Sequence, residues 1–441
     1  MRQIAGIVTL AATALLLAGG ACASAAAVGV AGVPSPAVRV AGVAAPAVRV
    51  AGVPAPAVRV AGVPASAVRV GGVPAAAVRV VDVPGVAGRS VRIAAAGRLA
   101  DGGAIVAGTV APVRRGARPR LVVVRLRHDG IVDEAFGDEG VVTAQLARGG
   151  GRGGSHATAV AVDPASGRSW IGAAVGRTAA GAVLALDGHG RRVRGFGTNA
   201  VVRLHGDASA PTAVAYGGGR LAVAATQQPC GGCQLLLLDA RSGARGPSAA
   251  LAPVAGGDAG GCPRAQLTSL AFVGGGRLVL GGSGGSCPTR VVVRDGTLGA
   301  VGVWGVGAEA QRTVVAAAGA PLDLCTSIER AGAVTVVRAN AGAAAPGFTL
   351  PSPGWPAIPG AIGGIVPLGD GACGALVLHG GGAAQVLQAS DGDARPAVVA
   401  LPAGLRAGAI YRCERDVLVV GTRRSGGVDR AAVAVTPIAR R

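Results

Sequence analysis

Aromatic residues are scarce in this sequence: its 441 residues include only three Trp, two Tyr and four Phe. Long segments with the 3.6-residue periodicity of an amphipathic helix are also missing, which argues against helical domains. Glycine (77) and proline (27) recur between short apolar segments, a pattern typical of strands joined by tight turns. The length exceeds that of a usual single core, so we expect an all-β fold with one large closed architecture and appended segments.

Lysine is absent: all 42 basic residues are arginine, against 22 acidic residues, and the formal net charge is +20. Dense positive charge attracts nucleic acids and other polyanions. The arginines are nevertheless spread along the whole chain, without interleaved aromatic residues or a recognition helix. We therefore expect no nucleic-acid partner and retain an anionic polymer of the cell envelope as one candidate.

The N-terminus lacks an apolar segment long enough to span a membrane as a stable helix. Residues 1–25 have instead the parts of a secretory signal peptide: a basic start, an apolar run from Ile4 to Leu17, and small residues after it. Cys22 raises the alternative of a lipid anchor, but Gly19 stands where a lipoprotein signal has leucine. We expect ordinary cleavage, no transmembrane span afterwards, and a protein that is secreted or held in the cell envelope.

Seven cysteines follow Cys22, an odd number, so at least one stays a thiol or pairs between chains. In an oxidising compartment disulfides are the default. We expect Cys373 to pair with Cys413, because both precede the second strand of neighbouring repeat units and equivalent positions of such units lie close together. Cys262 with Cys287 is the next choice.

The closely spaced Cys230 and Cys233 could instead form a redox or metal motif. A zinc site needs two more ligands, and no second C-x-x-C pair or nearby histidine supplies them. A thioredoxin-like motif lies at a helix N-terminus, whereas these residues lie between two strand-like runs. We therefore expect structural cysteines here as well.

Residues 31–80 are five tandem decapeptides of the form AGVPAPAVRV. Their prolines lack a backbone N–H and fix φ, which opposes helices and central strands and favours extended, polyproline-like chain. We expect residues 26–74 to form a low-complexity stalk or linker. Two alternatives stay open: the segment packs or self-associates through its Val-Arg-Val strands, or its evenly spaced arginines bind anionic wall polymers.

A looser period of roughly 40 to 60 residues, as in four-stranded propeller blades, begins near residue 90. Its apolar runs are nearly continuous, which fits strands covered on both faces. Seven pairs of such runs predict a seven-bladed β-propeller over residues 75–441. The predicted second strands are 103–110, 168–175, 220–226, 277–282, 321–327, 374–380 and 416–421, and the third strands are 121–126, 182–187, 234–239, 290–295, 333–338, 383–388 and 431–436.

The last unit has too little chain for a fourth strand after its third strand at 431–436. An unpaired outer edge promotes aggregation, and propellers commonly let one terminus complete the blade of the other. Residues 75–83 are apolar, free of proline, and directly precede the first unit. We predict that they pair beside residues 430–436 and close the ring.

A motif follows the third strand of the first unit and recurs, more weakly, in the second. It consists of Asp129, Gly130, Asp133, Phe136, Gly137 and Gly140, and then of Asp187, Gly190, Phe196 and Gly197. This pattern resembles the delta-sixty repeat family of bacterial propeller proteins, in which an Asp-Gly turn precedes a Phe-Gly pair and the outermost strand. The resemblance implies a propeller and an exported location, without a general enzymatic activity. We expect the glycines to occupy turn positions with positive φ and each phenylalanine to fill the gap between adjacent blades.

No catalytic, cofactor or metal site is predicted. The acidic run 133–139 lacks the alternate-residue spacing of a calcium loop. No serine or glycine motif matches a nucleophile elbow or a phosphate-binding loop. The five histidines lack metal-ligand spacing; they are His128, His156, His189, His205 and His379.

These features indicate an exported, non-enzymatic propeller that acts as an extracellular or cell-envelope binding or scaffold module for a protein or a wall glycan. The ends of the inner strands converge on the central channel, which makes the channel and its loop face the expected ligand site. The alternative is a propeller-class enzyme, a lyase or a quinone-dependent dehydrogenase. It would need clustered His, Arg and acidic groups at the channel mouth.

Overall fold

The computed structural model describes residues 77–80, 83, 86, 89–112, 117–147, 153–176, 180–204, 208–227, 233–251, 266–273, 276–283, 291–295, 297–298, 300–304, 312–318, 323–330, 333–340, 358–369, 372–389, 397–413, 416–425 and 427–438. The predicted signal peptide and the predicted stalk, residues 26–74, lie outside these residues. Within them, no helix has the length and hydropathy that a membrane crossing requires.

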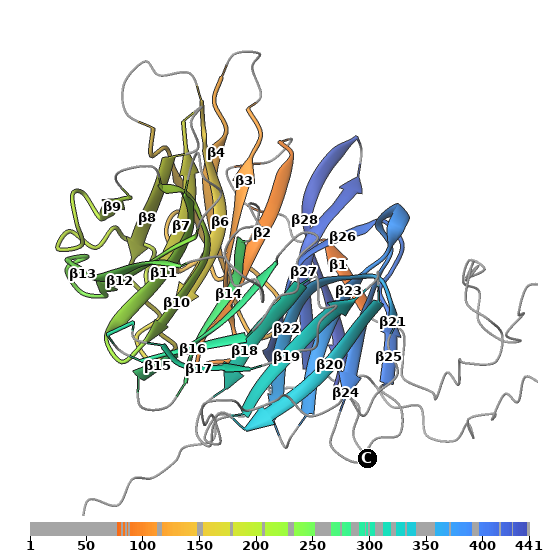
Figure 1. Cartoon of the computed structure of the whole chain (residues 1–441). Helices are drawn as coiled ribbons and strands as arrows, with labels where there is room; N and C mark the ends of the chain where they lie inside the picture. The colour runs from red at the N-terminus through yellow and green to blue at the C-terminus, as the bar shows by residue number, and fades with distance from the viewer. Residues whose placement is uncertain are drawn as a thin grey trace, which may run out of the picture. The chain divides into compact units, whose positions relative to one another are not determined.

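The described strands form antiparallel meanders of four strands each (Figure 1). Meander 1 contains β2 (Val91–Arg98), β3 (Ala104–Val110), β4 (Arg120–Leu126) and β5 (Val141–Ala144). Meander 2 contains β6 (Ser155–Val162), β7 (Ser169–Val175), β8 (Ala180–Leu186) and β9 (Val201–Arg203). Meander 3 contains β10 (Ala208–Gly217), β11 (Arg220–Gln227), β12 (Cys233–Asp239) and β13 (Arg245–Leu251).

Four further meanders of the same topology follow toward the C-terminus. Meander 4 contains β14 (Gln266–Val273), β15 (Arg277–Ser283), β16 (Val291–Arg294) and β17 (Ala300–Trp304). Meander 5 contains β18 (Arg312–Ala318), β19 (Asp323–Arg330), β20 (Ala333–Asn340) and β21 (Ile358–Pro359), and meander 6 contains β22 (Ala361–Gly369), β23 (Ala372–Leu378), β24 (Ala384–Ala389) and β25 (Ala397–Ala400). Meander 7 contains β26 (Leu405–Cys413), β27 (Asp416–Ser425), β28 (Val428–Pro437) and, from the other end of the chain, β1 (Ala77–Val80).

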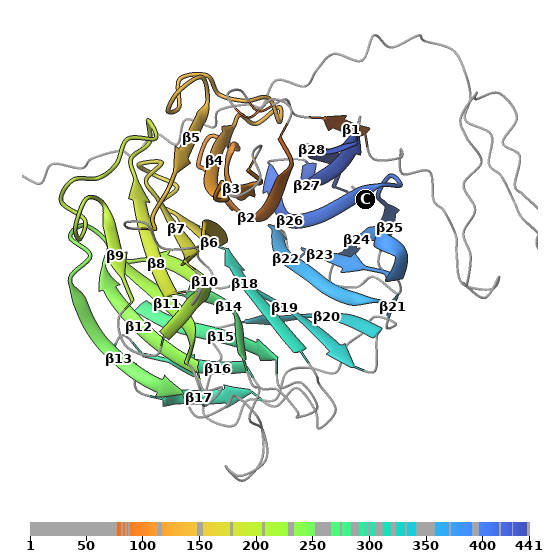
Figure 2. The ribbon, with the colours of Figure 1, turned by 90° about the horizontal axis from the view of Figure 1, so that it is seen from above.

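The first strands of the meanders make a closed series of contacts. Each first strand contacts the first strand of the next meander, from β2 through β6, β10, β14, β18 and β22 to β26, and β26 contacts β2. Figure 2 shows these first strands toward the centre and the later strands farther out. Single bridge pairs also join meander 2 to meander 3 (Ala180 with Ser209) and meander 4 to meander 5 (Ser283 with Arg312).

The predicted closure by the N-terminal segment is confirmed. Strand β1 pairs antiparallel with β28, from Ala77 opposite Val435 to Val80 opposite Ala432. The outer edge of β28 is therefore covered by chain that lies far away in the sequence, which removes an exposed edge from the last meander.

Hydrophobic cores lie between adjacent meanders. One core combines Leu121 and Val123 of meander 1 with Ala182 and Leu184 of meander 2, and comparable clusters follow at later junctions. The second strands are consequently buried on both faces, as in β3, where five consecutive residues from Ala104 are buried. This two-sided burial explains the nearly continuous apolar runs from which the second and third strands were predicted, and each predicted run overlaps an observed strand.

Candidate functional site

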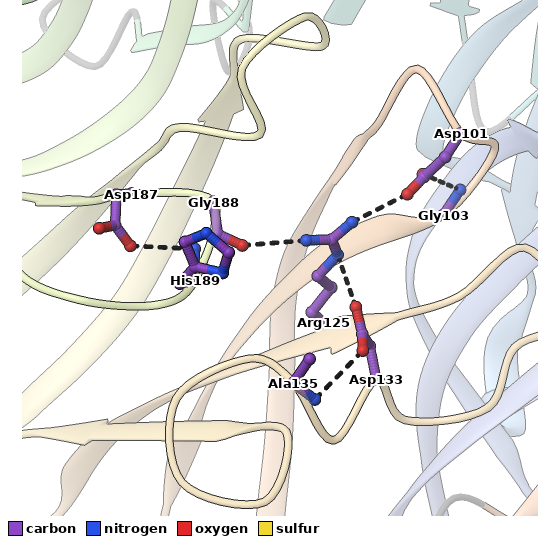
Figure 3. A network of polar contacts seen from close by, with 8 residues as sticks. All are labelled: Asp101, Gly103, Arg125, Asp133, Ala135, Asp187, Gly188 and His189. Carbon is purple, nitrogen blue, oxygen red and sulfur yellow. Dashed lines mark hydrogen bonds and ion pairs between the residues drawn. The ribbon is translucent and has the colours of Figure 1, made fainter.

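Polar side chains concentrate where two turns meet at one end of meander 1. In an antiparallel meander, the turn from the first to the second strand and the turn from the third to the fourth strand lie at the same end. Here the first of these turns carries Asp101 and the second carries Asp133. Arg125, near the end of β4, lies between them (Figure 3).

Arg125 binds three oxygen atoms. Its Nη2 donates to Asp101 Oδ2 at 2.9 Å, its Nε donates to Asp133 Oδ2 at 3.0 Å, and its Nη1 donates to the carbonyl of Gly188 in meander 2 at 2.9 Å. The side chains of Arg125 and Asp133 are only 23% and 21% exposed. Charge-assisted bonds to partly buried groups are stronger than neutral ones, so this network ties both turns of meander 1 to its neighbour.

The carboxylates of this network also hold their own turns. Asp101 Oδ1 accepts from the backbone N–H of Gly103 at 2.8 Å, and Asp133 Oδ1 accepts from that of Ala135 at 3.2 Å. Each carboxylate thus bonds both a guanidinium and a backbone donor. The arrangement therefore fixes the backbone of both turns.

A backbone bond beside this network joins the same two meanders. The N–H of Gly137 donates to the carbonyl of His189 at 2.8 Å. The turn of meander 2 comes so close that a Cβ on Gly190, whose φ is +78°, would lie 2.9 Å from the nitrogen of Gly137. Phe136, directly before Gly137, is fully buried in the core shared by the two meanders.

The junction of meanders 2 and 3 repeats this backbone bond. The N–H of Gly197 donates to the carbonyl of Ser242 at 2.8 Å, and Phe196 is fully buried in the core that the two meanders share. The expectation that each phenylalanine fills the gap between neighbouring units is therefore confirmed at both junctions. The glycines predicted to have positive φ, Gly130, Gly137, Gly140 and Gly197, have values of +76°, +66°, +88° and +54°.

The side-chain chemistry of this second junction differs from that of the first. Trp170 of β7 stacks on Tyr216 of β10 with ring centroids 4.7 Å apart and an interplanar angle of 21°. The indole Nε1 donates to the carbonyl of Ala240 at 3.2 Å, and the guanidinium of Arg168 lies 5.7 Å from the Trp170 ring centroid. Burial and, to a smaller extent, the negative charge of Asp163 raise the pKa of Tyr216. An aromatic stack thus replaces the arginine network of the first junction.

Aspartates begin the turns that follow the third strands. Asp129 Oδ1 accepts from the N–H of Ile131, and Asp187 Oδ1 accepts from the N–H of His189. In meander 3 the Asp239 carboxylate accepts from both the hydroxyl and the N–H of Ser242, and these bonds hold the pKa of Asp239 below its usual value. These contacts explain the aspartates as turn residues.

The histidines differ in their exposure. His189 and His156 are exposed, His128 and His379 are half-buried, and His205 lies outside the described residues. Across the part of the chain that the structure covers, no three His, Cys, Asp or Glu residues come close enough to hold a metal ion.

The predicted pairing of Cys373 with Cys413 is wrong. Cys373 forms a disulfide with Cys325, with Cα atoms 5.8 Å apart. Both residues lie on second strands, β23 and β19, of adjacent meanders, whereas Cys413 ends the first strand β26. Cys413 is buried, and its thiol donates to the carbonyl of His128 at 3.6 Å. The second predicted pairing, Cys262 with Cys287, lies outside the described residues, as do Cys230 and the side chain of Cys233.

The structure contains one cleft that the sequence did not predict. A hollow of about 330 Å³ lies between the chain that follows β5 and the region around β9, and it is lined by Gln145, Arg192 and Arg203 among others. No motif marks these residues, because they meet only when the outer parts of meanders 1 and 2 come together.

Comparison with known proteins establishes the fold. No family model matches the sequence, and no curated protein is detectably similar to it. Among solved structures, the β-propeller domain of Myceliophteria thermophila Cps50 (Swd1) matches with a TM-score of 0.50 and 13% identity, over 82% of this chain and 100% of that domain. A chain from a crystal structure of the mitotic checkpoint complex matches with a TM-score of 0.50 and 12% identity, over 82% of this chain and 94% of the other. The chain therefore has a β-propeller fold, with all-β architecture.

Proposed function

We propose that this chain is an exported, non-enzymatic β-propeller that acts as a binding or scaffold module outside the cytoplasm or in the cell envelope. The observation that carries the proposal is the Arg125 network, in which two carboxylates and a guanidinium bond one another and the adjacent turns. Charged groups used in this way make a rigid surface for a partner. They are poorly arranged for the chemistry of a lyase or a quinone-dependent dehydrogenase, which is the alternative.

In this proposal each meander is one blade, so that the ring has seven blades and β1 completes the last. The chain is a divergent member of the delta-sixty repeat family, whose Asp-Gly and Phe-Gly positions join one blade to the next at the first two junctions. Export agrees with the signal-like residues 1–25 and with the disulfide between Cys325 and Cys373, since disulfides persist in oxidising compartments.

The partner is a protein or a wall glycan bound at the end of the blades that carries the turns. Ile131 lies in one of these turns and is a large apolar side chain that is 40% exposed. One of the similar propellers belongs to a multiprotein complex by its description, which supports a protein partner. Propellers present short loops from every blade at such an end, and these loops suit an extended contact.

Capture from the organism's own envelope extract tests the proposal. The full exported chain is immobilised and compared with Ile131→Asp and, as a matched control, Val398→Asp, which changes another exposed aliphatic residue (44% exposed) on β25. We expect a saturable ligand that the first variant loses and the control retains. Equal retention by both variants would exclude the Ile131 region as the binding surface, and fractionation that finds the chain in the cytoplasm would refute export.

A further inference from the structure

The cleft between meanders 1 and 2 has the size of a small-molecule site. Its volume is about 330 Å³, within the range of roughly 300–1,000 Å³ that ligand pockets occupy. One wall follows β5 and contains Gln145. The other wall contains Arg192, Thr198, Asn199 and Arg203 from the turn before β9 and from β9 itself.

Two arginines give the cleft a positive charge. Arg203 is half-buried and donates through Nη2 to the carbonyl of Leu146, which holds its guanidinium across the junction. A guanidinium has five N–H donors, so most of its donors are left for a ligand. Arg192 is exposed at the rim, and none of the described lining residues is acidic. This combination selects an anion with oxygen acceptors.

Gln145 adds a requirement that a simple anion does not meet. Both its Nε2 and Oε1 atoms are buried, and neither has a hydrogen-bond partner in the described structure. Buried polar groups are almost always satisfied, and an exception calls for an explanation. The amide presents donors and an acceptor together, so its complement must both accept and donate. A fully ionised sulfate accepts only, whereas a hydroxyl group does both.

We propose that this cleft binds a carboxylate that carries hydroxyl groups, the chemistry of a uronic-acid sugar. The carboxylate lies against Arg203 and Arg192, and the hydroxyls bond the amide of Gln145 and the polar side chains of Thr198 and Asn199. This site does not include Ile131 among its lining residues, although Arg192, Thr198 and Asn199 lie in a turn at the same end of the blades. The site is tested with purified protein and a sugar alone. A negative result would therefore leave the proposed binding function unaffected, and a failure of the envelope capture would leave this site unaffected.

Calorimetry with the full chain tests the charge requirement. Galacturonate should bind with a dissociation constant of about 1 mM or tighter, and galactose, which has a hydroxymethyl group in place of the carboxylate, should not bind. Arg192→Gln should weaken galacturonate binding about tenfold or more, because it removes charged donors. The matched control Arg191→Gln removes the same charge one residue away, outside the lining of the cleft, and should change the constant less than about twofold.

Gln145→Met tests the amide with two readouts. It should weaken galacturonate binding about tenfold, and it should also raise the melting temperature of the unliganded protein, because a buried amide without a partner is replaced by an apolar group of similar size. A residue with a purely structural role would lower the melting temperature instead. Trigalacturonate that binds more tightly than the monosaccharide would place the ligand in a polymer, and preference for the monosaccharide would indicate a free sugar acid; both support the site.

Several results would overturn the inference. If galactose binds as tightly as galacturonate, the carboxylate does not contribute to binding. If Arg191→Gln and Arg192→Gln have equal effects, Arg192 acts through the general positive charge of the surface and not through a contact in the cleft. Unchanged binding by Gln145→Met would remove the role of the amide. Absence of any binding heat and of any shift in melting temperature with galacturonate would reject the site altogether.

Discussion

Deletion of residues 75–89 should open the ring at the junction of meanders 7 and 1. It removes β1, whose four residues pair with Ala432 to Val435 of β28, and it removes the segment between β1 and β2. Two side chains of that segment, Val83 and Val86, are buried at 7% and 4% exposure. Val83 lines a small void of about 10 Å³ together with residues of β3, β4, β27 and β28, so it lies at the contact of the two ends of the chain.

The expected loss of melting temperature follows from the burial of these two valines. Fully burying a valine side chain is worth about 1.5–3 kcal/mol, so the two valines together contribute roughly 3–6 kcal/mol. The lost strand pairing adds to this figure. With an unfolding entropy of about 2.1 cal/mol/K per residue, a ring of roughly 350 residues loses about 1.4 °C of melting temperature per kcal/mol. The deletion should therefore lower the melting temperature by about 4–8 °C or more.

Calorimetric melting of the deletion protein, compared with one that lacks residues 31–70, measures this effect. The control deletion removes decapeptide repeats and leaves β1 in place, and it should change the melting temperature by less than about 1 °C. The exposed edge of β28 should also make the first variant associate, visible by size-exclusion chromatography. Equal losses of melting temperature in the two proteins would refute closure by β1.

Three further predictions concern side chains. Arg125→Gln should lower the free energy of unfolding by about 1–3 kcal/mol in denaturant titrations, because two carboxylates and a carbonyl lose a charged donor; a loss below about 0.5 kcal/mol would class the network with weak surface pairs. Non-reducing peptide mapping should join Cys325 to Cys373 and find Cys413 as a thiol, and reduction should cost up to about 4 kcal/mol for the separation of 48 residues. The pKa of Asp239 is lowered in the folded state, so its stabilisation is present above about pH 4 and is lost as the pH falls through the lower folded value. Asp239→Asn should therefore lower the melting temperature near pH 7, and this effect should shrink as the pH falls below about 4. An effect that does not change with pH would contradict the assignment.

The second and third strands could be predicted because their burial is two-sided. Five consecutive buried residues in β3 correspond to an uninterrupted apolar run in the sequence. First strands give a weaker signal: in β6 buried and more exposed residues alternate, and the register with β7 shifts between Ala157 and Ala159. Comparable shifts occur in β2, β10, β14, β22 and β26. The shift does not interrupt the alternation of β6, in which every second residue from Ser155 to Ala161 is buried, so the signal is weaker because only one face of the strand is fully buried.

The cysteine pairing was predicted wrongly because the boundary between a first strand and a second strand is not marked in the sequence. The principle that equivalent positions of adjacent units lie close together holds for Cys325 and Cys373, which occupy early positions in β19 and β23. Cys413 precedes the apolar run of its unit in the sequence, as Cys373 does, but it belongs to the preceding strand β26. Cys413, the last residue of β26, pairs with Asp416, the first residue of β27, and the sequence between them contains no proline or glycine to mark the end of the strand.

The junctions show which part of the repeat the fold requires. At the first two junctions the bond from a glycine N–H to a carbonyl of the next meander recurs, at Gly137 and Gly197. The side chains around it change from an arginine network to an aromatic stack. Farther along, apolar clusters fill the junctions of meanders 3 with 4, 5 with 6, and 6 with 7, and a disulfide joins meanders 5 and 6. Burial between sheets is non-directional, so any apolar set of adequate volume holds two meanders together. Among the described residues, the glycine bond is seen at the first two junctions, where it fixes the turns in addition to the apolar contacts between the sheets.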